Sequence, residues 1–371
     1  MTAAESADSF PERDFQSETA ATIPVTALTG FLGSGKTTLL NRLLRHPGMN
    51  DTAVLINEFG DVGIDHMLVR EVKENAVLLN SGCLCCTVRE DLVVSLRELL
   101  RLRFSVMSDV PAFRRVLIET TGLADPAPII HTLMTDLVIG RRYRLDGIVT
   151  TVDAMHGSGQ LDEHMEAVKQ AAVADRLVLT KTDLAEPETV AALRRRLRAL
   201  NPAAPVLTAV LGEIAPEALL DAGLFNPQSK IPEVTRWLNA EAFVPDHRAH
   251  GEDRHDHGHT KHGHDVNRHD ERIAAFCLTR ERPIPWNAFV DWIEMLIATQ
   301  GANLLRVKGV LNLAGEERPV AVHGVQHVFH PPTVLPSWPD DDRRSRLVFI
   351  TRDLGRQAVE DTFDAFVGKA A

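Results

Sequence analysis

The most chemically specific segment of the sequence is the glycine-rich run at residues 30–37, GFLGSGKT. It fits the pattern G-x-x-x-x-G-K-[ST], whose backbone N–H groups surround a phosphate while the lysine reaches the β/γ oxygens and the hydroxyl binds Mg²⁺. The apolar residues 23–29 predict a buried strand before it, and residues 38–44 predict a helix after it. We therefore expect a nucleoside triphosphate site whose contacts come from Gly30, Gly33, Ser34, Gly35, Lys36, Thr37 and Thr38.

A second motif, Glu119-Thr120-Thr121-Gly122, follows the apolar run at residues 115–118. A phosphate-binding-loop NTPase places an acidic residue for the Mg²⁺ shell at such a strand end, followed by a glycine whose N–H can contact the γ-phosphate. We predict these roles for Glu119 and Gly122. The alternative is a glutamate that only ends its strand.

A third motif, Thr180-Lys181-Thr182-Asp183, follows the apolar run at residues 176–179. It resembles the N-K-x-D motif that reads guanine in GTPases, with Thr180 in place of the usual Asn. Asp183 would accept hydrogen bonds from guanine N1–H and N2–H₂, while Lys181 lies along the base plane. Adenine lacks this pair of donors and would leave the carboxylate unpaired, so the motif predicts GTP rather than ATP. An Asp that merely caps its turn is the alternative.

Three of the four cysteines are clustered in Gly82-Cys83-Leu84-Cys85-Cys86. Disulfides are disfavoured in a reducing compartment, and thiolates at this spacing can converge on one soft or borderline cation. We predict a zinc site formed by Cys83, Cys85 and Cys86 with a fourth position left open; a redox switch or inert thiols are the alternatives. Cys277, alone in an apolar run, is expected to be a core residue.

Histidines form a second candidate metal-binding segment. Eight of the 16 histidines lie between residues 247 and 269, among Gly, Asp and Arg residues that cannot build an apolar core. We expect a solvated loop that binds Zn²⁺, Ni²⁺, Co²⁺ or Cu²⁺ weakly, or else a linker with incidental histidines. The weak sites would use His255, His257, His259, His262 and His264.

The overall composition limits the expected partners and location. The chain has 371 residues, 44% of them hydrophobic, and its 51 acidic and 40 basic residues give a net charge of −11. This balance argues against nucleic acid as the main partner. No apolar stretch reaches the ~18 residues of a membrane span, and residues 1–22 are polar and lack the pattern of a signal peptide. We expect a cytoplasmic protein, a monomer or homodimer, with no membrane partner.

Alternating apolar and helical patterns predict the elements that position these motifs. Short apolar runs typical of buried parallel strands are separated by segments with helical periodicity, which predicts an α/β domain with a doubly wound, mainly parallel sheet and a ligand site at the carboxyl edge. Residues 272–371 predict a smaller α+β domain, with strands near 272–279, 304–313, 319–329 and 346–351 and helices at 286–298 and from 356. The predicted organisation is a disordered tail at 1–22, a P-loop domain at 23–240, a His-rich linker at 241–271 and a second domain at 272–371.

Taken together, the motifs resemble those of the CobW-like metallochaperone GTPases, of the zinc-regulated GTPase metalloprotein activator type. This family is related to the nickel-insertion GTPases of urease and hydrogenase maturation. The resemblance rests on the order and spacing of GFLGSGKTT (30–38), INEFG (56–60), GCLCC (82–86), ETTGLADP (119–126) and TKTD (180–183), and on LRVKGVL (305–311) in the second domain.

The resemblance implies GTP hydrolysis coupled to delivery of zinc, or in some relatives cobalt, to a client apo-metalloprotein. Lys36, Glu58 and Glu119 would be the catalytic residues, and Cys83, Cys85 and Cys86 would hold the transferred metal. Glu58 could join the Mg²⁺ shell, orient water or be the fourth metal ligand; the alternative is a solvated loop glutamate without such a role. The competing interpretations are a cobalt-handling GTPase of cobalamin synthesis, a metal buffer or storage protein with vestigial nucleotide binding, and a small-molecule kinase.

Overall fold

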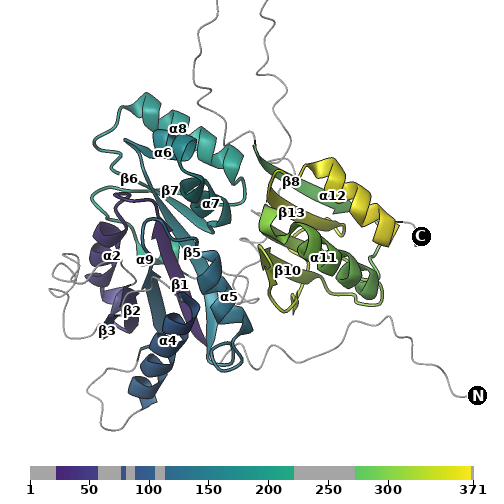
Figure 1. Cartoon of the computed structure of the whole chain (residues 1–371), viewed down its shortest axis with the longest axis horizontal. Coiled ribbons are helices and arrows are strands. Elements are labelled where there is room, and N and C mark those ends of the chain that lie inside the picture. The colour runs from purple at the N-terminus through teal and green to yellow at the C-terminus, as the bar shows by residue number, and fades with distance from the viewer. Residues whose placement is uncertain (1–21, 57–76, 81–87, 105–112, 221–271, 369–371) are drawn as a thin grey trace, which may run out of the picture.

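The computed structural model describes residues 22–56, 77–80, 88–104, 113–220 and 272–368 (Figure 1). Among these residues, no helix combines the length and the apolarity needed to cross a lipid bilayer. The described chain forms two sheets, each with its own hydrophobic core.

The first sheet has seven strands in the order β3-β2-β4-β1-β5-β6-β7, and all pairings are parallel. Its strands are short, apolar and rich in β-branched residues, as expected where helices cover both faces. The predicted doubly wound parallel sheet is confirmed. The strands are β1 (Ile23–Gly30), β2 (Thr52–Ile56), β3 (Val77–Asn80), β4 (Arg115–Glu119), β5 (Tyr143–Asp153), β6 (Arg176–Thr180) and β7 (Val206–Ala209).

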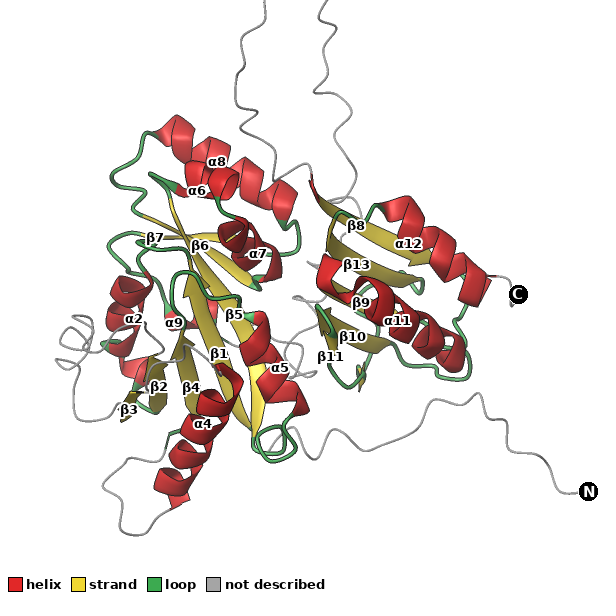
Figure 2. Ribbon diagram, viewed as in Figure 1, coloured by secondary structure: helices red, strands yellow, loops and turns green. Residues whose placement is uncertain are grey.

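Helices pack on both faces of this sheet (Figure 2). On one face, leucines of α2 and α9 pack against alternate residues of the strands, such as Leu28 and Val149. On the other face, α4, α5, α7 and α8 cover residues such as Val25 and Leu177. The helices are α2 (Lys36–Leu44), α4 (Val88–Phe104), α5 (Ala127–Thr135), α6 (Gly157–Glu163), α7 (Met165–Val173), α8 (Pro187–Leu200) and α9 (Pro216–Leu219), with a 3₁₀ turn at Pro47–Met49.

The second sheet is antiparallel and has the strand order β11-β10-β9-β13-β8. A sixth strand, β12, also pairs with β10. One face packs on α11 and α12, where Trp292 is fully buried beside Phe349 and Phe363. The predicted α+β second region is thereby confirmed. Its elements are β8 (Ile273–Arg280), α11 (Trp286–Gln300), β9 (Leu304–Leu311), β10 (Val320–Val325), β11 (Val328–Phe329), β12 (Thr333–Val334), β13 (Ser345–Arg352) and α12 (Arg356–Phe363), with a 3₁₀ turn at Gly301–Asn303 and a π-helical turn at Asp364–Gly368.

The continuous strand region expected at residues 319–329 is two strands. Gln326 has a positive φ of 53°, and the chain reverses there so that Val325 pairs with Val328.

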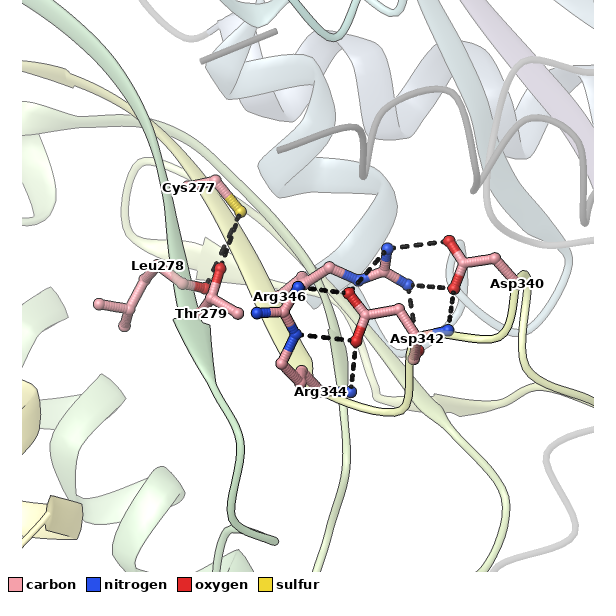
Figure 3. Close-up of polar contacts among 7 residues, drawn as sticks. All are labelled: Cys277, Leu278, Thr279, Asp340, Asp342, Arg344 and Arg346. Carbon is pink, nitrogen blue, oxygen red and sulfur yellow. Dashed lines mark hydrogen bonds and ion pairs between the residues drawn. The ribbon is translucent and has the colours of Figure 1, made fainter. Parts of the chain in front are cut away.

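The loop before β13 is held by charged groups, because Arg346 donates to both carboxylate oxygens of Asp340 at 2.8 and 2.7 Å (Figure 3). Arg344 pairs in the same way with Asp342.

Cys277 is buried in β8, as expected for a core residue. It packs with Val348 and with Ala203 of the first region, and burial raises the pKa of its thiol. The second sheet therefore has one face on its own helices and the other toward α7 and α8 of the first region.

Candidate functional site

The predicted nucleotide motifs meet at the carboxyl edge of the first sheet. Gly30 at the end of β1 lies beside Thr151 of β5, and Ile56 at the end of β2 lies beside Glu119. Further along this edge, Asp153 lies beside Thr180. Because parallel strands end on one side, a single edge carries the glycine-rich loop, the Glu119 motif and the Thr180 motif.

The glycine-rich loop requires glycine for close packing. At Gly30, φ is 143°, and a Cβ atom would lie 2.3 Å from Oγ1 of Thr151. Gly33 and Gly35 also have positive φ angles, of 68° and 86°. Residues with a Cβ atom rarely adopt these φ angles, so the three positions favour glycine. Helix α2 begins directly after Gly35, at Lys36. Its N-terminus adds positive potential next to the loop.

Thr37 and Glu119 face each other across the site. Thr37 Oγ1 donates a hydrogen bond to Glu119 Oε1 at 2.7 Å, and Glu119 is 5% exposed. A hydroxyl and a carboxylate are hard oxygen donors of the type that Mg²⁺ binds, so this pair fits a magnesium site. Lys36 Nζ donates to the carbonyl oxygens of Gly30 and Phe31, at 2.9 and 3.1 Å, and so spans the loop.

The loop after β4 is clasped against the glycine-rich loop. A Cβ atom on Gly122 would lie 2.8 Å from the backbone N and Cα of Leu32, so only glycine fits this approach. Gln170 of α7, which is buried, donates to the carbonyl oxygens of Gly122 and Ala124 at 3.1 and 3.0 Å. Gln170 was not identified from the sequence, because it belongs to no motif.

The Thr180 motif is attached to the same loop. Thr180 Oγ1 donates to the carbonyl oxygen of Ser34 at 2.8 Å, and the Ser34 hydroxyl bonds that of Thr151 at 2.7 Å. Thr180, which stands where the N-K-x-D motif has Asn, therefore links this motif to the glycine-rich loop. Lys181 Nζ donates to Asp153 Oδ2 at 2.8 Å, and Asp183 is exposed to solvent.

Several predicted site residues lie outside the described residues. These are Glu58, the three clustered cysteines and the histidines of residues 255–264. The described chain reaches Ile56 before Glu58 and Asn80 before Cys83, and these two strand ends are paired in register at the edge that carries Glu119. Within the described ranges there is no group of three His, Cys, Asp or Glu residues that could hold a metal ion.

A second polar cluster lies between the two sheets, outside the three nucleotide motifs. The carboxylate of Asp175, between α7 and β6, pairs with Arg306 and with Lys308 of β9, the latter at 2.6 Å. Burial opposes its ionisation, but the two cations outweigh this effect and lower the pKa of Asp175 to about 2. Burial also lowers the pKa of Lys308, to about 8. The cluster is therefore ionised at neutral pH and joins the two regions.

The loop after β4 also contacts the second region. Asp125 Oδ2 accepts hydrogen bonds from Gln326, at the β10–β11 turn, at 3.2 Å and from Lys169 of α7 at 3.4 Å. The segment that contains Gly122 is thus held by the glycine-rich loop, by α7 and by the second sheet.

Comparison with protein families matches most of the chain. The family model described as "CobW/HypB/UreG, nucleotide-binding domain" matches residues 24–208. The model described as "Cobalamin synthesis protein cobW C-terminal domain" matches residues 273–367.

Individual relatives show the same relationship, one over most of the chain and one over about half of it. The zinc chaperone YjiA of Escherichia coli is 33% identical over 343 residues, which cover 92% of this chain and 98% of the relative. The zinc-regulated GTPase metalloprotein activator 1 of Schizosaccharomyces pombe is 36% identical over 199 residues, 52% of this chain and 47% of the relative. The crystal structure of Zn(II)-bound YjiA GTPase superposes with a TM-score of 0.65 at 27% identity, covering 93% of this chain and 99% of that one.

Proposed function

Because the chain belongs to the CobW/HypB/UreG family, we propose that it is a GTP-hydrolysing metallochaperone. In this function it binds zinc through Cys83, Cys85 and Cys86, passes the metal to a client metalloprotein and uses the bound nucleotide to control release. The observation that carries the proposal is the meeting of the three nucleotide motifs at one sheet edge, with Thr37 Oγ1 2.7 Å from Glu119 Oε1.

Each nucleotide motif has a role that its geometry supports. The N–H groups of residues 30–38 and Lys36 would hold the phosphates, and Thr37 and Glu119 would hold Mg²⁺, which neutralises the charge that develops on the phosphate oxygens. Gly122, packed against Leu32, would present its backbone to the γ-phosphate. Asp183, exposed beside the tethered Thr180, would read the guanine base.

The proposed zinc site rests on chemistry and on chain order. Cys83, Cys85 and Cys86 follow β3, whose end at Asn80 is paired in register with Ile56, and Ile56 in turn with Glu119. Three thiolates with an open fourth position suit a metal that must be handed on. The names of the relatives, a zinc chaperone and a zinc-regulated activator, support zinc as the cargo. The histidines at 255–264 would be a weaker collecting site.

A metal buffer with vestigial nucleotide binding is disfavoured by the same geometry. Such a protein has no use for a hydroxyl and a buried carboxylate held 2.7 Å apart beside a phosphate-binding loop. A delivery protein needs both sites and a link between them. By linkage, if GTP tightens metal binding by some factor, the metal tightens GTP binding by the same factor.

The link can be measured by titrating zinc against a calibrated chelator. We expect tighter zinc binding with Mg²⁺ and a non-hydrolysable GTP analogue than with GDP, by roughly 5- to 150-fold for a typical coupling of ~1–3 kcal/mol. Replacing Cys85 and Cys86 together with serine should abolish tight binding. The matched control is Cys277→Ala, which should leave the binding unchanged because this cysteine is buried in the second sheet. Equal zinc affinities in the two nucleotide states would refute control of release by GTP.

A further inference from the structure

The end of β5 carries a buried carboxylate that none of the motifs includes. Asp153 is the last residue of β5, and its side chain is 2% exposed. One oxygen, Oδ1, accepts from the backbone N–H of Met155 at 2.8 Å. The other, Oδ2, lies 2.8 Å from Lys181 Nζ and 3.1 Å from His156 Nδ1. Burial opposes the ionisation of this group, but the hydrogen bonds from Lys181 and His156 outweigh burial and lower the pKa of Asp153.

The lysine that Asp153 holds is set in an unusual backbone conformation. Lys181 has a φ of 55°, in the left-handed region that residues other than glycine rarely adopt. Its side chain is 36% exposed, whereas the carboxylate that it contacts is almost fully enclosed. The preceding residue, Thr180, is fixed by its hydrogen bond to Ser34. The lysine is therefore anchored at both ends, through its backbone and through its ammonium group.

We propose that Asp153 is a positioning residue for guanine nucleotides: it holds Lys181 so that the aliphatic stem of this lysine forms one wall of the base site before the nucleotide arrives. This inference rests on the proposed assignment of residues 180–183 to the guanine base. A lysine has many rotamers, and ordering such a side chain only on binding weakens affinity. Prior anchoring by a buried carboxylate removes that loss. The pair differs from an ordinary surface ion pair, since its acidic partner is shielded from water and salt.

Asp153→Asn tests this role, because asparagine keeps the size and the acceptor for Met155 but loses the charge. Titration of a fluorescent N-methylanthraniloyl GDP should show about tenfold weaker binding, equivalent to ~1.4 kcal/mol. The KM for GTP should rise by a similar factor while kcat stays unchanged, since the lost contact is the same in the ground and transition states. A role limited to folding would not produce this separation of KM from kcat.

Lys181→Met provides the test from the other side of the pair. Methionine keeps an apolar stem but cannot bond to Asp153, so it should weaken GDP binding by a similar factor. The double variant should bind no more weakly than either single variant, because the two residues act as one unit. The matched control is Asp162→Asn, which breaks another partly buried ion pair, with Arg196, and should leave GDP affinity unchanged.

The outcomes separate this inference from the function on which it rests. If the wild-type protein does not bind the GDP analogue, the guanine assignment and the positioning role both fall. If the wild-type protein binds it and Asp153→Asn binds equally well, or loses kcat with an unchanged KM, only the positioning role falls. Should Asp153→Asn fail to fold, Lys181→Met decides alone, and unchanged affinity there overturns the inference.

Discussion

At the scale of single residues, the distance between Thr37 and Glu119 is the most informative geometry. Residues that are 82 positions apart in sequence are joined by a 2.7 Å hydrogen bond, beside the loop that would hold the phosphates. Glu119 is a buried carboxylate that directly follows the apolar residues Val116, Leu117 and Ile118 of its strand, and its packing gives no evident reason for a charge there. We predict that both oxygens share a hard cation, Mg²⁺.

Glu119→Gln should therefore reduce GTP turnover while the protein remains folded. The amide keeps the size of the side chain but not its negative charge, so the magnesium shell and the transition-state charge are less well stabilised. We expect kcat to fall by about 10²–10³-fold, the usual effect of removing one electrostatic contact of this kind. A phosphate-release assay with varied Mg²⁺ would measure it.

The control for this variant is Glu186→Gln, a change at an exposed residue just before α8. It should leave turnover unaltered. If Glu119→Gln also retained full turnover, the carboxylate would only end its strand, and the magnesium assignment would be wrong.

The sequence predicts Lys36, Thr37 and Glu119 because each stands in a local motif whose spacing depends on phosphate chemistry. Asp153 and Gln170 belong to no such motif, and the contacts that matter here, with Lys181 for Asp153 and with Gly122 and Ala124 for Gln170, are made to residues 28 to 48 positions away. Thr180 is an intermediate case. Its motif is recognisable, but its bond to Ser34, 146 positions away, depends on how two loops pack.

At the scale of elements, the loop after β4 is the piece most constrained by its neighbours. It touches the glycine-rich loop at Gly122, accepts two hydrogen bonds from Gln170 and reaches the second sheet through Asp125. A change of nucleotide that moved Gly122 would therefore also alter the contacts of this loop with α7 and with the β10–β11 turn. This arrangement would connect the proposed nucleotide site physically to the second region.

Gln170→Ala tests how strongly α7 holds this loop. The substitution leaves the carbonyl groups of buried Gly122 and half-buried Ala124 without these donors, a loss of about 1–3 kcal/mol in the free energy of unfolding. Urea denaturation would measure that loss. Gln160→Ala is the matched control, because Gln160 makes one long bond, of 3.4 Å, to Leu32 in an exposed setting, and its removal should cost under ~0.5 kcal/mol. Equal effects of the two variants would contradict the proposed clasp.

The strands of the first sheet are predictable from the sequence to within a few residues, because fully buried parallel strands are continuous apolar runs. The ends of β1, β4 and β6 also coincide with motifs that punctuate the pattern. The helices α5, α6 and α7 are less evident, since α5 is apolar on most sides and α6 is only seven residues long. The split between β10 and β11 depends on one left-handed residue, Gln326, whose type gives no warning of it.

At the scale of the whole molecule, an ion cluster fixes how the two regions sit against each other. Asp175 comes from the first region, and Arg306 and Lys308 come from the second, and all three side chains are buried. No periodicity in the sequence predicts this pairing: the two basic residues alternate with apolar ones in β9, as they would on a solvated strand. Their burial becomes understandable only once α7 and α8 cover that face.

Asp175→Asn should strongly destabilise the protein, since it leaves two buried cations without their counter-charge. Removing one partner of a buried ion pair typically costs about 3–5 kcal/mol in the free energy of unfolding. Chemical denaturation at pH 7 would measure this. Asp364→Asn is the control, because Asp364 pairs with Arg280 in a more exposed position, and its loss should be below ~1 kcal/mol. A small loss of stability in Asp175→Asn would mean that water solvates the two cations once the carboxylate is removed, and it would contradict this role of the cluster.

Next to this cluster, His323 and His330 stack with their ring centroids 4.7 Å apart, and both are buried. Burial lowers the pKa of His330 to about 3, with the nearby charges of Arg306 and Lys308 adding to the shift and Asp175 opposing it. Burial likewise lowers the pKa of His323 well below its usual value, and the neighbouring His330, Arg306 and Lys308 act in the same direction. Both rings are therefore neutral in the folded protein at physiological pH.

These histidines should make the folded state sensitive to mild acid. Below the unfolded pKa of about 6.5 the unfolded chain binds protons that the folded chain excludes, so stability falls as the pH is lowered from that value. For His330 alone the loss at pH 5 is on the order of 2 kcal/mol. Asp175 does not contribute in this window, because its folded pKa of about 2 and its unfolded pKa of about 3.9 both lie below it.

The test is urea denaturation at pH 7 and pH 5 for the wild type and for the double variant His323→Phe with His330→Phe. Phenylalanine preserves the stacked aromatic pair but cannot be protonated, so the double variant should lose most of the acid-induced fall in stability. His46→Ala, at an exposed position, should keep the slope of the wild type. If the double variant lost as much stability between pH 7 and pH 5 as the wild type, protonation of the buried pair His323 and His330 would not be the source of the pH dependence. The acid-sensitive groups would then lie elsewhere in the protein.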